Sequence, residues 1–475
     1  MSRQILRNYF LLFLLITCIS ARLMAQESTP YSRFGLGYSV DNNTIASSMM
    51  GGLGASYRSA DGPNYINPAS YSAVRYISLD AGIAGNFDRL KTQTLKSKNN
   101  NFSFNYLSLT FPIKKYWASS VGLLPFSNKD YFVSQTSQLD TANAVKVEYE
   151  GSGSLYNLYW GNGFSYKGFS VGLNMGYLFG KLNNNTFAYP VDQNGVYDPQ
   201  SATTWSFNDV KASSFVWNAG AQYTQVIKNK KDSTKFLIID YGVSGSAPFR
   251  IKGKSYLDQA TYGFESKYFS ARGADQSLID FINEVIRPRA EDTATYASFL
   301  DTLSENYGQK LNVKVPATLN IGISISGDIR WRAGVDFRYQ PWSKYVGYEN
   351  NIASKLYNSW RVGFGGEFMP NPKNFGKFFN RLRYRAGFYY TKTNIQIGNK
   401  SINEFGIDFG VGIPIASTIT NDEGMLQKIY TYAFNIGLEA GKRGSTNNNL
   451  VQETFLKLKI GFTLNDRWFV KRKYY

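Results

Sequence analysis

The sequence predicts an all-β protein: a transmembrane antiparallel β-barrel of fourteen strands with its N-terminal segment as a plug inside. Three observations carry this prediction. Apolar and polar residues alternate with period two over stretches of ten residues or more. After the N-terminal leader, no stretch has about 20 consecutive apolar residues, as a membrane-spanning helix would need. Aromatic residues are dense, with 35 Tyr, 34 Phe and 8 Trp among 475 residues, as in the girdles of barrels at membrane interfaces.

Residues 1–25 have the pattern of a signal peptide for Sec-type export. A basic start at Arg3 precedes the apolar run 9–19, which is too short to span a bilayer, and cleavage is expected after Ala25. Two alternatives remain open here. One is an uncleaved anchor, and the other is lipidation at Cys18, which a loosely lipoprotein-like sequence precedes.

The composition argues against most kinds of catalysis. The chain has no His, and its single Cys lies in the leader, so the commonest general bases, nucleophiles and metal ligands are missing. We therefore expect no enzyme activity, no catalytic residue, no metal and no cofactor. A net charge of +18 could indicate nucleic acid, but an exported, aromatic-rich chain makes outer-membrane lipid and lipopolysaccharide the expected surroundings and nucleic acid no partner.

The alternation identifies strands that are long enough to cross a bilayer. In 169–180 the odd positions are Phe, Val, Leu, Met, Tyr and Phe, whereas the even positions are mostly small or polar. Strands of globular proteins usually have about 5–6 residues, but a tilted transmembrane strand needs about 9–11. Because hydrocarbon cannot satisfy an open sheet edge, such strands must close into a barrel.

The predicted strands number fourteen, an even number as in bacterial single-chain barrels. With the N-terminus in the periplasm, short turns fall at one end of the strands and the long loops 182–210 and 250–310 at the other. We therefore expect residues 73–475 to form a monomeric barrel in the outer membrane of a Gram-negative-type bacterium. The expected strands are 74–87, 101–113, 115–137, 144–166, 168–181, 211–228, 234–249, 311–326, 329–345, 353–369, 380–392, 402–415, 428–441 and 451–465.

The face opposite the apolar one lines the interior, and in the last six strands this face is strongly charged. One interpretation is a salt-bridge network that packs a wet lumen. The other is a cationic path that attracts a carboxylate or another anion, and both can hold because basic residues outnumber acidic ones. The candidate ligand-binding or lumen-lining residues are Arg330, Arg332, Arg338, Arg361, Arg383, Arg385, Lys457 and Lys459.

Residues 26–72 lack sustained alternation and are rich in Gly, Ser, Asn and Tyr. A fourteen-stranded barrel is wider than the kind that wall side chains alone can fill, so it is either open or plugged. Irregular backbone is tolerated at membrane depth inside protein. Apolar residues such as Met49, Met50 and Leu53 argue against the alternative, a disordered periplasmic tail. We therefore predict that residues 26–72 form a plug, or hatch, within the barrel.

Four places in the chain share a likeness to one known family. They are SRFGLGYS with SMMGGLGASYRSADGPNYINPASYSA after it, GSGSLYNLYWGNGFSYKGFSVGLNMGYLFG, VPATLNIGISIS and the ending IGFTLNDRWF. In these stretches the chain resembles the FadL-like outer-membrane transporters of long-chain fatty acids and other hydrophobic compounds (FadL/TodX type). In that family a glycine-rich hatch ends in an Asn-Pro-Ala motif just before the first strand. Here the motif matches Asn67, Pro68 and Ala69.

The resemblance implies uptake of a hydrophobic or amphipathic small molecule, such as a long-chain fatty acid, past the hatch and through a gap in the barrel wall. Candidate positions for the gap are Pro125, Gly151 and Gly153, because Pro and Gly interrupt strand pairing; an ordinary bend is the alternative. The charged lumen departs from the family and suits an amphipathic or anionic ligand. The alternative function is a structural or assembly barrel that docks exported proteins or lipoproteins.

Overall fold

The computed structural model describes residues 29–138, 144–192, 202–228, 236–263, 298–327, 330–347, 355–371, 378–420, 426–447 and 450–466. The predicted signal peptide, residues 1–25, lies outside these ranges. No helix within them is both long and apolar enough to cross a membrane.

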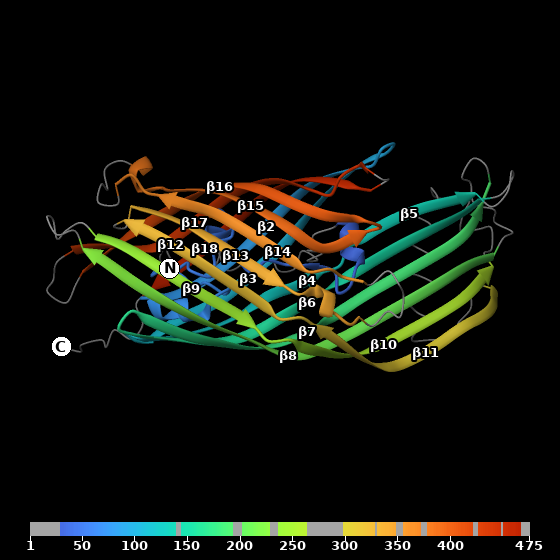
Figure 1. Ribbon diagram of the computed structural model, residues 1–475, viewed down its shortest axis with the longest axis horizontal. Coiled ribbons are helices and arrows are strands. Elements are labelled where there is room, and N and C mark those ends of the chain that lie inside the picture. The colour runs from blue at the N-terminus through green and yellow to red at the C-terminus, as the bar shows by residue number, and fades with distance from the viewer. Residues whose placement is uncertain are drawn as a thin grey trace, which may run out of the picture.

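The described strands form a closed antiparallel barrel of fourteen strands, as predicted (Figure 1). Last strand meets first: β18 pairs with β2 from Gln452 opposite Lys91 to Asp466 opposite Ile77. Among the described strands, three are interrupted and carry two labels each. The strands are β2 (Ile77–Lys91), β3 (Lys96–Lys114), β4 (Trp117–Asn128) with β5 (Tyr131–Gln138), β6 (Ala144–Tyr166), β7 (Phe169–Val191), β8 (Ala202–Lys228), β9 (Phe236–Ser246) with β10 (Phe249–Gly263), β11 (Ser298–Val315) with β12 (Thr318–Gly327), β13 (Trp331–Gln340), β14 (Ser359–Phe368), β15 (Arg383–Ile397), β16 (Lys400–Thr420), β17 (Leu426–Arg443) and β18 (Gln452–Asp466).

The alternation of the sequence becomes the two faces of the wall. On β7, Phe169 and Val171 point outward and are 61% and 55% exposed, whereas Ser170 and Asn174, at even positions, point inward and are buried. The outer face is therefore an apolar band of the kind that meets lipid in outer-membrane barrels.

Six labelled strands continue beyond the others at one end of the barrel, which we call the extended end; the opposite end is the turn end (Figure 1). The six are β5, β6, β7, β8, β10 and β11, and here β10 pairs with both β8 and β11. The stretches 182–210 and 250–310, expected to be loops, are therefore mostly strand, apart from 193–201 and 264–297, which lie outside the described residues. Sequence alternation missed them because beyond the apolar band both faces of a strand are polar, as in Asn183–Asn185.

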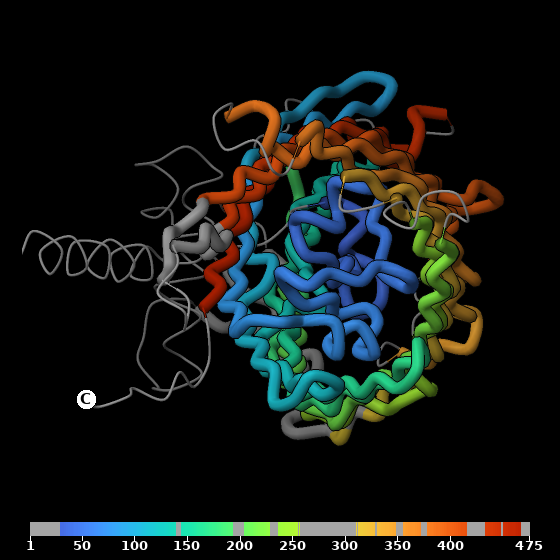
Figure 2. The backbone as a smooth tube through the Cα atoms, turned by 90° about the vertical axis from the view of Figure 1, so that its left-hand side faces the viewer, coloured from blue at the N-terminus to red at the C-terminus, as the bar shows by residue number. Residues whose placement is uncertain are grey.

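Residues 29–74, which we call the inner segment, lie inside the ring of strands (blue in Figure 2). Its elements are short: η1 (Pro30–Arg33), β1 (Tyr38–Ser39), α2 (Ile45–Ser48) and η2 (Pro68–Ala73). Thr44 caps α2, with its hydroxyl oxygen accepting a hydrogen bond from the Ser47 N–H at 3.2 Å. The remaining described helices, η5 (Trp342–Lys344) and η7 (Phe378–Arg381), lie in connections between wall strands.

The hydrophobic core lies between the inner segment and the wall. One cluster joins Tyr65 and Ile45 of the inner segment to Tyr106 and Tyr159 of the wall. A second joins Leu36 to a group of wall residues at the base of the extended strands. The inner segment therefore supplies one half of the core, and the barrel wall the other.

Candidate functional site

The inner segment presses against the wall at positions where the wall has no side chain. A Cβ at Gly387 would lie 2.0 Å from the Gly51 nitrogen, and one at Gly242 only 1.9 Å from the Ala55 oxygen, too close for any L-residue to fit unchanged. These lumen-facing glycines form a ring that we call the glycine belt. Its members, at which a Cβ would come within 3 Å of the inner segment, are Gly161, Gly163, Gly172, Gly220, Gly242, Gly363, Gly365, Gly387, Gly410, Gly437 and Gly461.

The Asn-Pro-Ala motif fastens the end of the inner segment to the wall. Asn67 caps η2, because its side-chain oxygen accepts a hydrogen bond from the Ala69 N–H at 3.1 Å. Its Nδ2 donates to the Ala55 oxygen at 2.7 Å and lies near two wall carbonyls, of Ala221 at 3.2 Å and Val243 at 3.3 Å. Fully buried, Asn67 thus ties two turns of the inner segment to β8 and β9. Next to it, Pro68 takes the first position of the helical turn, where a missing N–H costs nothing.

Two aspartates of the inner segment pair with wall arginines. Asp41 accepts hydrogen bonds from Arg338 on β13 and from Arg361 on β14, the latter at 2.5 Å. Asp61 pairs with Arg383 on β15 at 2.6 Å. Three of the arginines predicted to line the lumen therefore hold the inner segment in place.

The other predicted lumen residues have different surroundings. Arg385 pairs within the wall, donating to Glu367 at 3.2 Å and to Asn435 at 2.7 Å, whereas Arg332 lies over the Tyr57 ring of the inner segment at 4.9 Å. Lys457 and Lys459 both meet Glu439. Arg330, by contrast, is exposed in the turn before β13, because that strand begins only at Trp331.

Arg443 is a buried cation that the sequence analysis did not single out. It lies at the end of β17 and is 1% exposed, with Nε donating to Glu404 at 2.6 Å and Nη1 to Glu453 at 3.1 Å. Thr29, the first described residue, donates its hydroxyl proton to Glu453 at 2.7 Å. Within the described residues, no group of three His, Cys, Asp or Glu could hold a metal ion.

The wall has a gap, which we call the notch, between β3 and the β4–β5 strand. Strands β3 and β4 pair from Lys114 opposite Trp117 only as far as Leu107 opposite Leu123. From Tyr106 to Lys96, β3 pairs with β2 on its other side. All of residues 96–138 are described, and no strand within them continues the pairing across the notch.

The inner segment occupies the β4–β5 edge of the notch. Here β1 pairs with the end of β4, with Tyr38 opposite Asn128. Farther along, the Thr29 N–H donates to the Asp130 oxygen at 2.9 Å. Residues 29–39 thus take the hydrogen-bonding place that β3 leaves.

The three residues predicted to interrupt the wall lie beside this edge. Pro125 precedes an irregularity in the pairing of β4 with β6. A Cβ at Gly151 would lie 2.1 Å from the Tyr131 ring, and Gly153 adopts φ of 117°, which favours glycine. Gly153 also accepts a hydrogen bond from the Lys129 N–H at 2.8 Å, at the break between β4 and β5. Whether they form a lateral gate stays a prediction.

A cavity of about 170 Å³ lies between the inner segment and the wall. Apolar rings form part of its lining, among them Phe126 and Phe249. Arg338 also lines it, so the cavity is amphipathic. Asn157 lines it as well, with a buried side-chain oxygen that has no hydrogen-bond partner.

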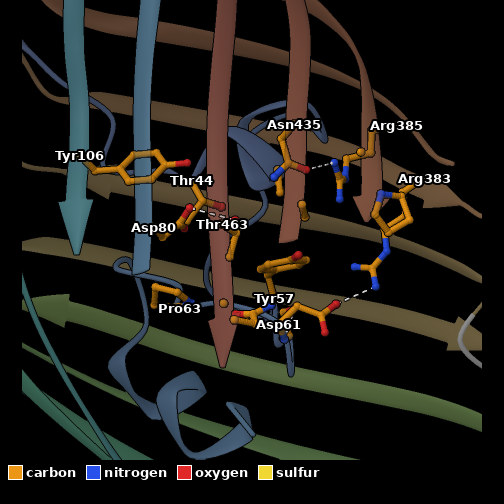
Figure 3. A pocket seen from close by; sticks show the side chains of 17 residues that line it. Thr44, Tyr57, Asp61, Pro63, Asp80, Tyr106, Arg383, Arg385, Asn435 and Thr463 are labelled. Atoms are coloured by element: carbon orange, nitrogen blue, oxygen red, sulfur yellow. Dashed lines mark hydrogen bonds and ion pairs between the residues drawn. The ribbon is translucent and has the colours of Figure 1, made fainter. Parts of the chain in front are cut away.

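A second cavity, of about 60 Å³, lies between other residues of the inner segment and other strands of the wall (Figure 3). The Asp61–Arg383 pair lines it, together with Arg385. Asp80 also lines it and accepts a hydrogen bond from the Thr463 hydroxyl at 3.0 Å. The two cavities thus lie against different strands of the wall.

Among solved structures, several barrels have a similar fold. The Ralstonia pickettii toluene transporter TbuX matches with a TM-score of 0.52 at 15% identity, over 89% of this chain and 98% of that one. The P. putida toluene transporter TodX matches with 0.52 at 12%, over 89% and 98%. A Pseudomonas aeruginosa FadL homologue matches with 0.50 at 13%, over 90% and 99%. At these identities the likeness establishes the fold. No protein of curated function matches the chain.

A family model covers the chain from end to end. It is described as BamG and matches residues 1–475. The resemblance to FadL-like proteins therefore holds for the fold, whereas the family that matches the sequence carries a different name. The chain belongs to the BamG family.

Proposed function

We propose that the protein is an outer-membrane channel that takes up small amphipathic molecules, and that the inner segment is its hatch. The observation that carries the proposal is the cavity of about 170 Å³ between hatch and wall. A cavity of about 150 Å³ lined by apolar side chains binds benzene, so this one has room for a molecule of that size. Its volume favours a compact ligand over a whole long-chain fatty acid.

The polar side of the cavity selects an amphipathic ligand over a hydrocarbon. The Asn157 amide oxygen, which has no hydrogen-bond partner, would stay without one beside a purely apolar molecule, and the Arg338 guanidinium offers a charged group that only a polar ligand can contact favourably. The FadL-type fold is compatible with this proposal, since the structures of similar fold include toluene transporters. In this proposal the extended end is extracellular, the turn end periplasmic, and the notch a lateral exit into the bilayer.

Disulfide locking tests the hatch, because the only cysteine in the chain is Cys18. Ser39 on β1 lies opposite Ser127 on β4, at a spacing that a disulfide can bridge. The oxidised Ser39→Cys/Ser127→Cys variant in liposomes should lose uptake of labelled benzyl alcohol, and reduction should restore it. Deletion of residues 27–70 should raise ion conductance in planar bilayers.

The matched control is Leu90→Cys/Ser97→Cys, a pair across the β2–β3 hairpin and away from the inner segment. It should transport whether oxidised or reduced. Equal uptake by the locked and unlocked hatch would contradict gating by this segment. No uptake by the wild-type protein above empty liposomes would contradict the channel itself.

A second candidate, an assembly barrel that docks exported proteins or lipoproteins, is favoured by the notch. Extended peptides bind proteins by adding a strand to an exposed sheet edge. At the notch, residues 29–39 already occupy such an edge and could exchange for a partner strand.

A photo-crosslinking residue at Phe132 on β5, which is 63% exposed beside the notch, tests this candidate in intact cells. Phe215 on β8, 61% exposed and distant in the sheet order, is the control position. Crosslinking of an exported protein or lipoprotein from position 132 alone, with no uptake by the wild type, would favour assembly over transport.

A further inference from the structure

We infer that Asp41 is the latch of the hatch, and that a small organic anion releases it by taking its place on Arg338. This inference rests on the proposed function. It adds the charge of the ligand and the residue that couples ligand binding to opening.

Asp41 fastens the inner segment to two neighbouring wall strands at once. One carboxylate oxygen accepts a hydrogen bond from Nη1 of Arg338, and the other accepts one from Nη1 of Arg361 at 2.5 Å. Because Arg338 and Arg361 lie opposite each other in the pairing of β13 with β14, a single carboxylate spans both strands. Burial alone would raise the pKa of Asp41, but the two guanidiniums hold it well below its usual range. The latch is therefore ionised at physiological pH.

Three cavities meet at this ion pair. Arg338 lines the amphipathic cavity of about 170 Å³ and also an adjacent one of about 80 Å³. Asp41 and Arg361 line that adjacent cavity and a third at this ion pair, of about 70 Å³. A ligand in the amphipathic cavity therefore reaches the same guanidinium that Asp41 occupies, and movement of Asp41 would join the three spaces.

Apart from Asp41 itself, the stretch 39–43 is held to the wall mainly by main-chain hydrogen bonds. These are the short β1–β4 pairing and one from the Val40 N–H to the Phe126 oxygen at 3.1 Å. Tyr38, just before this stretch, is fixed more firmly, because its hydroxyl donates to Glu404 at 3.2 Å and the Arg443 guanidinium lies 4.1 Å from its ring. From Ile45 onward, by contrast, the inner segment is seated in the glycine belt. Release of Asp41 would therefore free a short stretch while the remainder stays in place.

A displaced Asp41 carboxylate has space to move into. The third cavity is lined by Lys457 and Lys459, which share Glu439, and also by Glu404. Because Arg361 lines this cavity too, Asp41 can shift toward the two ammonium groups and keep its contact with Arg361.

The lining of the amphipathic cavity defines the ligand class. A guanidinium pairs best with a planar anion such as a carboxylate, which matches the group it would exchange for. The aromatic lining beside it, including Phe126 and Phe249, accommodates a compact ring. The expected ligand is thus a small aromatic carboxylate.

Benzoate and its neutral counterpart benzyl alcohol test the inference on the purified full-length barrel, by calorimetry in detergent and by conductance in planar bilayers. Wild-type protein should bind benzoate roughly tenfold more tightly, as a charge-assisted hydrogen bond provides, and benzoate should raise its conductance. Asp41→Asn should conduct without benzoate and gain nothing from it. Arg338→Gln should lose the preference for benzoate over benzyl alcohol.

Asp61→Asn is the matched control, because it makes the same charge change on the inner segment. The substitution breaks the 2.6 Å pair with Arg383, and Asp61 lines the cavity of about 60 Å³ instead of the amphipathic one. This variant should respond to benzoate as the wild type does.

The latch is overturned if Asp41→Asn remains closed and responds like the wild type, or if Asp61→Asn opens equally. Equal affinity of the wild type for both probes overturns the anionic ligand. In each of these cases the proposed uptake function stands, since the probes still bind. Failure of the wild type to bind either probe contradicts the proposed function instead.

Discussion

At the scale of single residues, Asn67 both caps a helical turn and joins the inner segment to the wall. Its amide caps η2 and also donates to carbonyls of both the inner segment and the wall. The motif was found from the sequence because Asn-Pro-Ala precedes the first strand. The contacts of Asn67 with the wall could not be predicted, since the carbonyls of Ala221 on β8 and Val243 on β9 lie more than a hundred residues away in the sequence.

Asn67→Ala should destabilise the barrel by about 2–3 kcal/mol, because it removes a helical cap and leaves buried carbonyls without their donor. Urea unfolding in detergent, followed by tryptophan fluorescence, measures the change. Asn447→Ala, at an exposed position, should change the free energy of unfolding by less than about 0.5 kcal/mol. Similar values for the two variants would contradict the anchoring role.

Substitution of Arg443 should lower the free energy of unfolding more than substitution of Asn67, since Arg443 is a buried cation between two buried carboxylates. Arg443→Met leaves Glu404 and Glu453 without this partner and should cost about 3–5 kcal/mol. Lys181→Ala, which removes a half-exposed partner of Asp209 at 2.7 Å, should cost less than about 1 kcal/mol. If urea unfolding gave similar losses of free energy for Arg443→Met and Lys181→Ala, burial would not make the Arg443 ion pairs more important for stability than a half-exposed pair.

At the scale of elements, the alternating pattern was sufficient to identify the strands inside the apolar band. All fourteen are present. The pattern did not identify strands outside this band, because there both faces of the wall are polar and no alternation remains. β10 and most of β11 were therefore expected to be loop. It also assigned Arg330 to the lumen, whereas β13 starts one residue later.

Part of the glycine belt is visible in the sequence as glycines on one face of a strand. On β14, for example, Gly363 and Gly365 both fall on the inward face, where they meet the backbone of Gly51 and Met50. Small residues recurring on one face of a strand indicate close approach of another backbone. That signal could have predicted which strands the inner segment touches, although not the path it takes between them.

Gly387→Val on β15 should displace the inner segment, because a Cβ there would lie 2.0 Å from the Gly51 nitrogen. The expected result is a higher ion conductance in planar bilayers with the barrel still folded. Ala386→Val, the neighbouring residue on the exposed face, is the control and should leave conductance unchanged. A closed channel in Gly387→Val would mean that the inner segment can yield at this contact.

At the scale of the whole molecule, the ion pair of Asp41 with two wall arginines should hold the inner segment in place even at mildly acidic pH. The two guanidiniums depress the pKa of Asp41 below its unfolded value of about 3.9. The stabilisation that this pair provides is therefore present above that value and is lost only as the pH falls through the lower, folded pKa.

Wild-type conductance in planar bilayers should accordingly stay constant from about pH 8 to about pH 4, since Asp41 remains ionised throughout. Asp41→Asn provides the comparison, with a raised conductance that is likewise independent of pH over this range. A wild-type conductance that rises between pH 6 and pH 4 would show that another titrating group holds the hatch.

The pairing of β2 with β18, which closes the barrel, also bears on the order of assembly. The inner segment leads directly into β2, while its contacts at Ile45 and Met49 rest on Gly461, Gly410 and Gly437 of the last three strands. Those surfaces exist only after the C-terminal strands have been synthesised and delivered. The inner segment is thus enclosed as the sheet curls around it, rather than threaded into a finished ring. A chain truncated before β16 would hold its N-terminal residues against only part of their final surroundings.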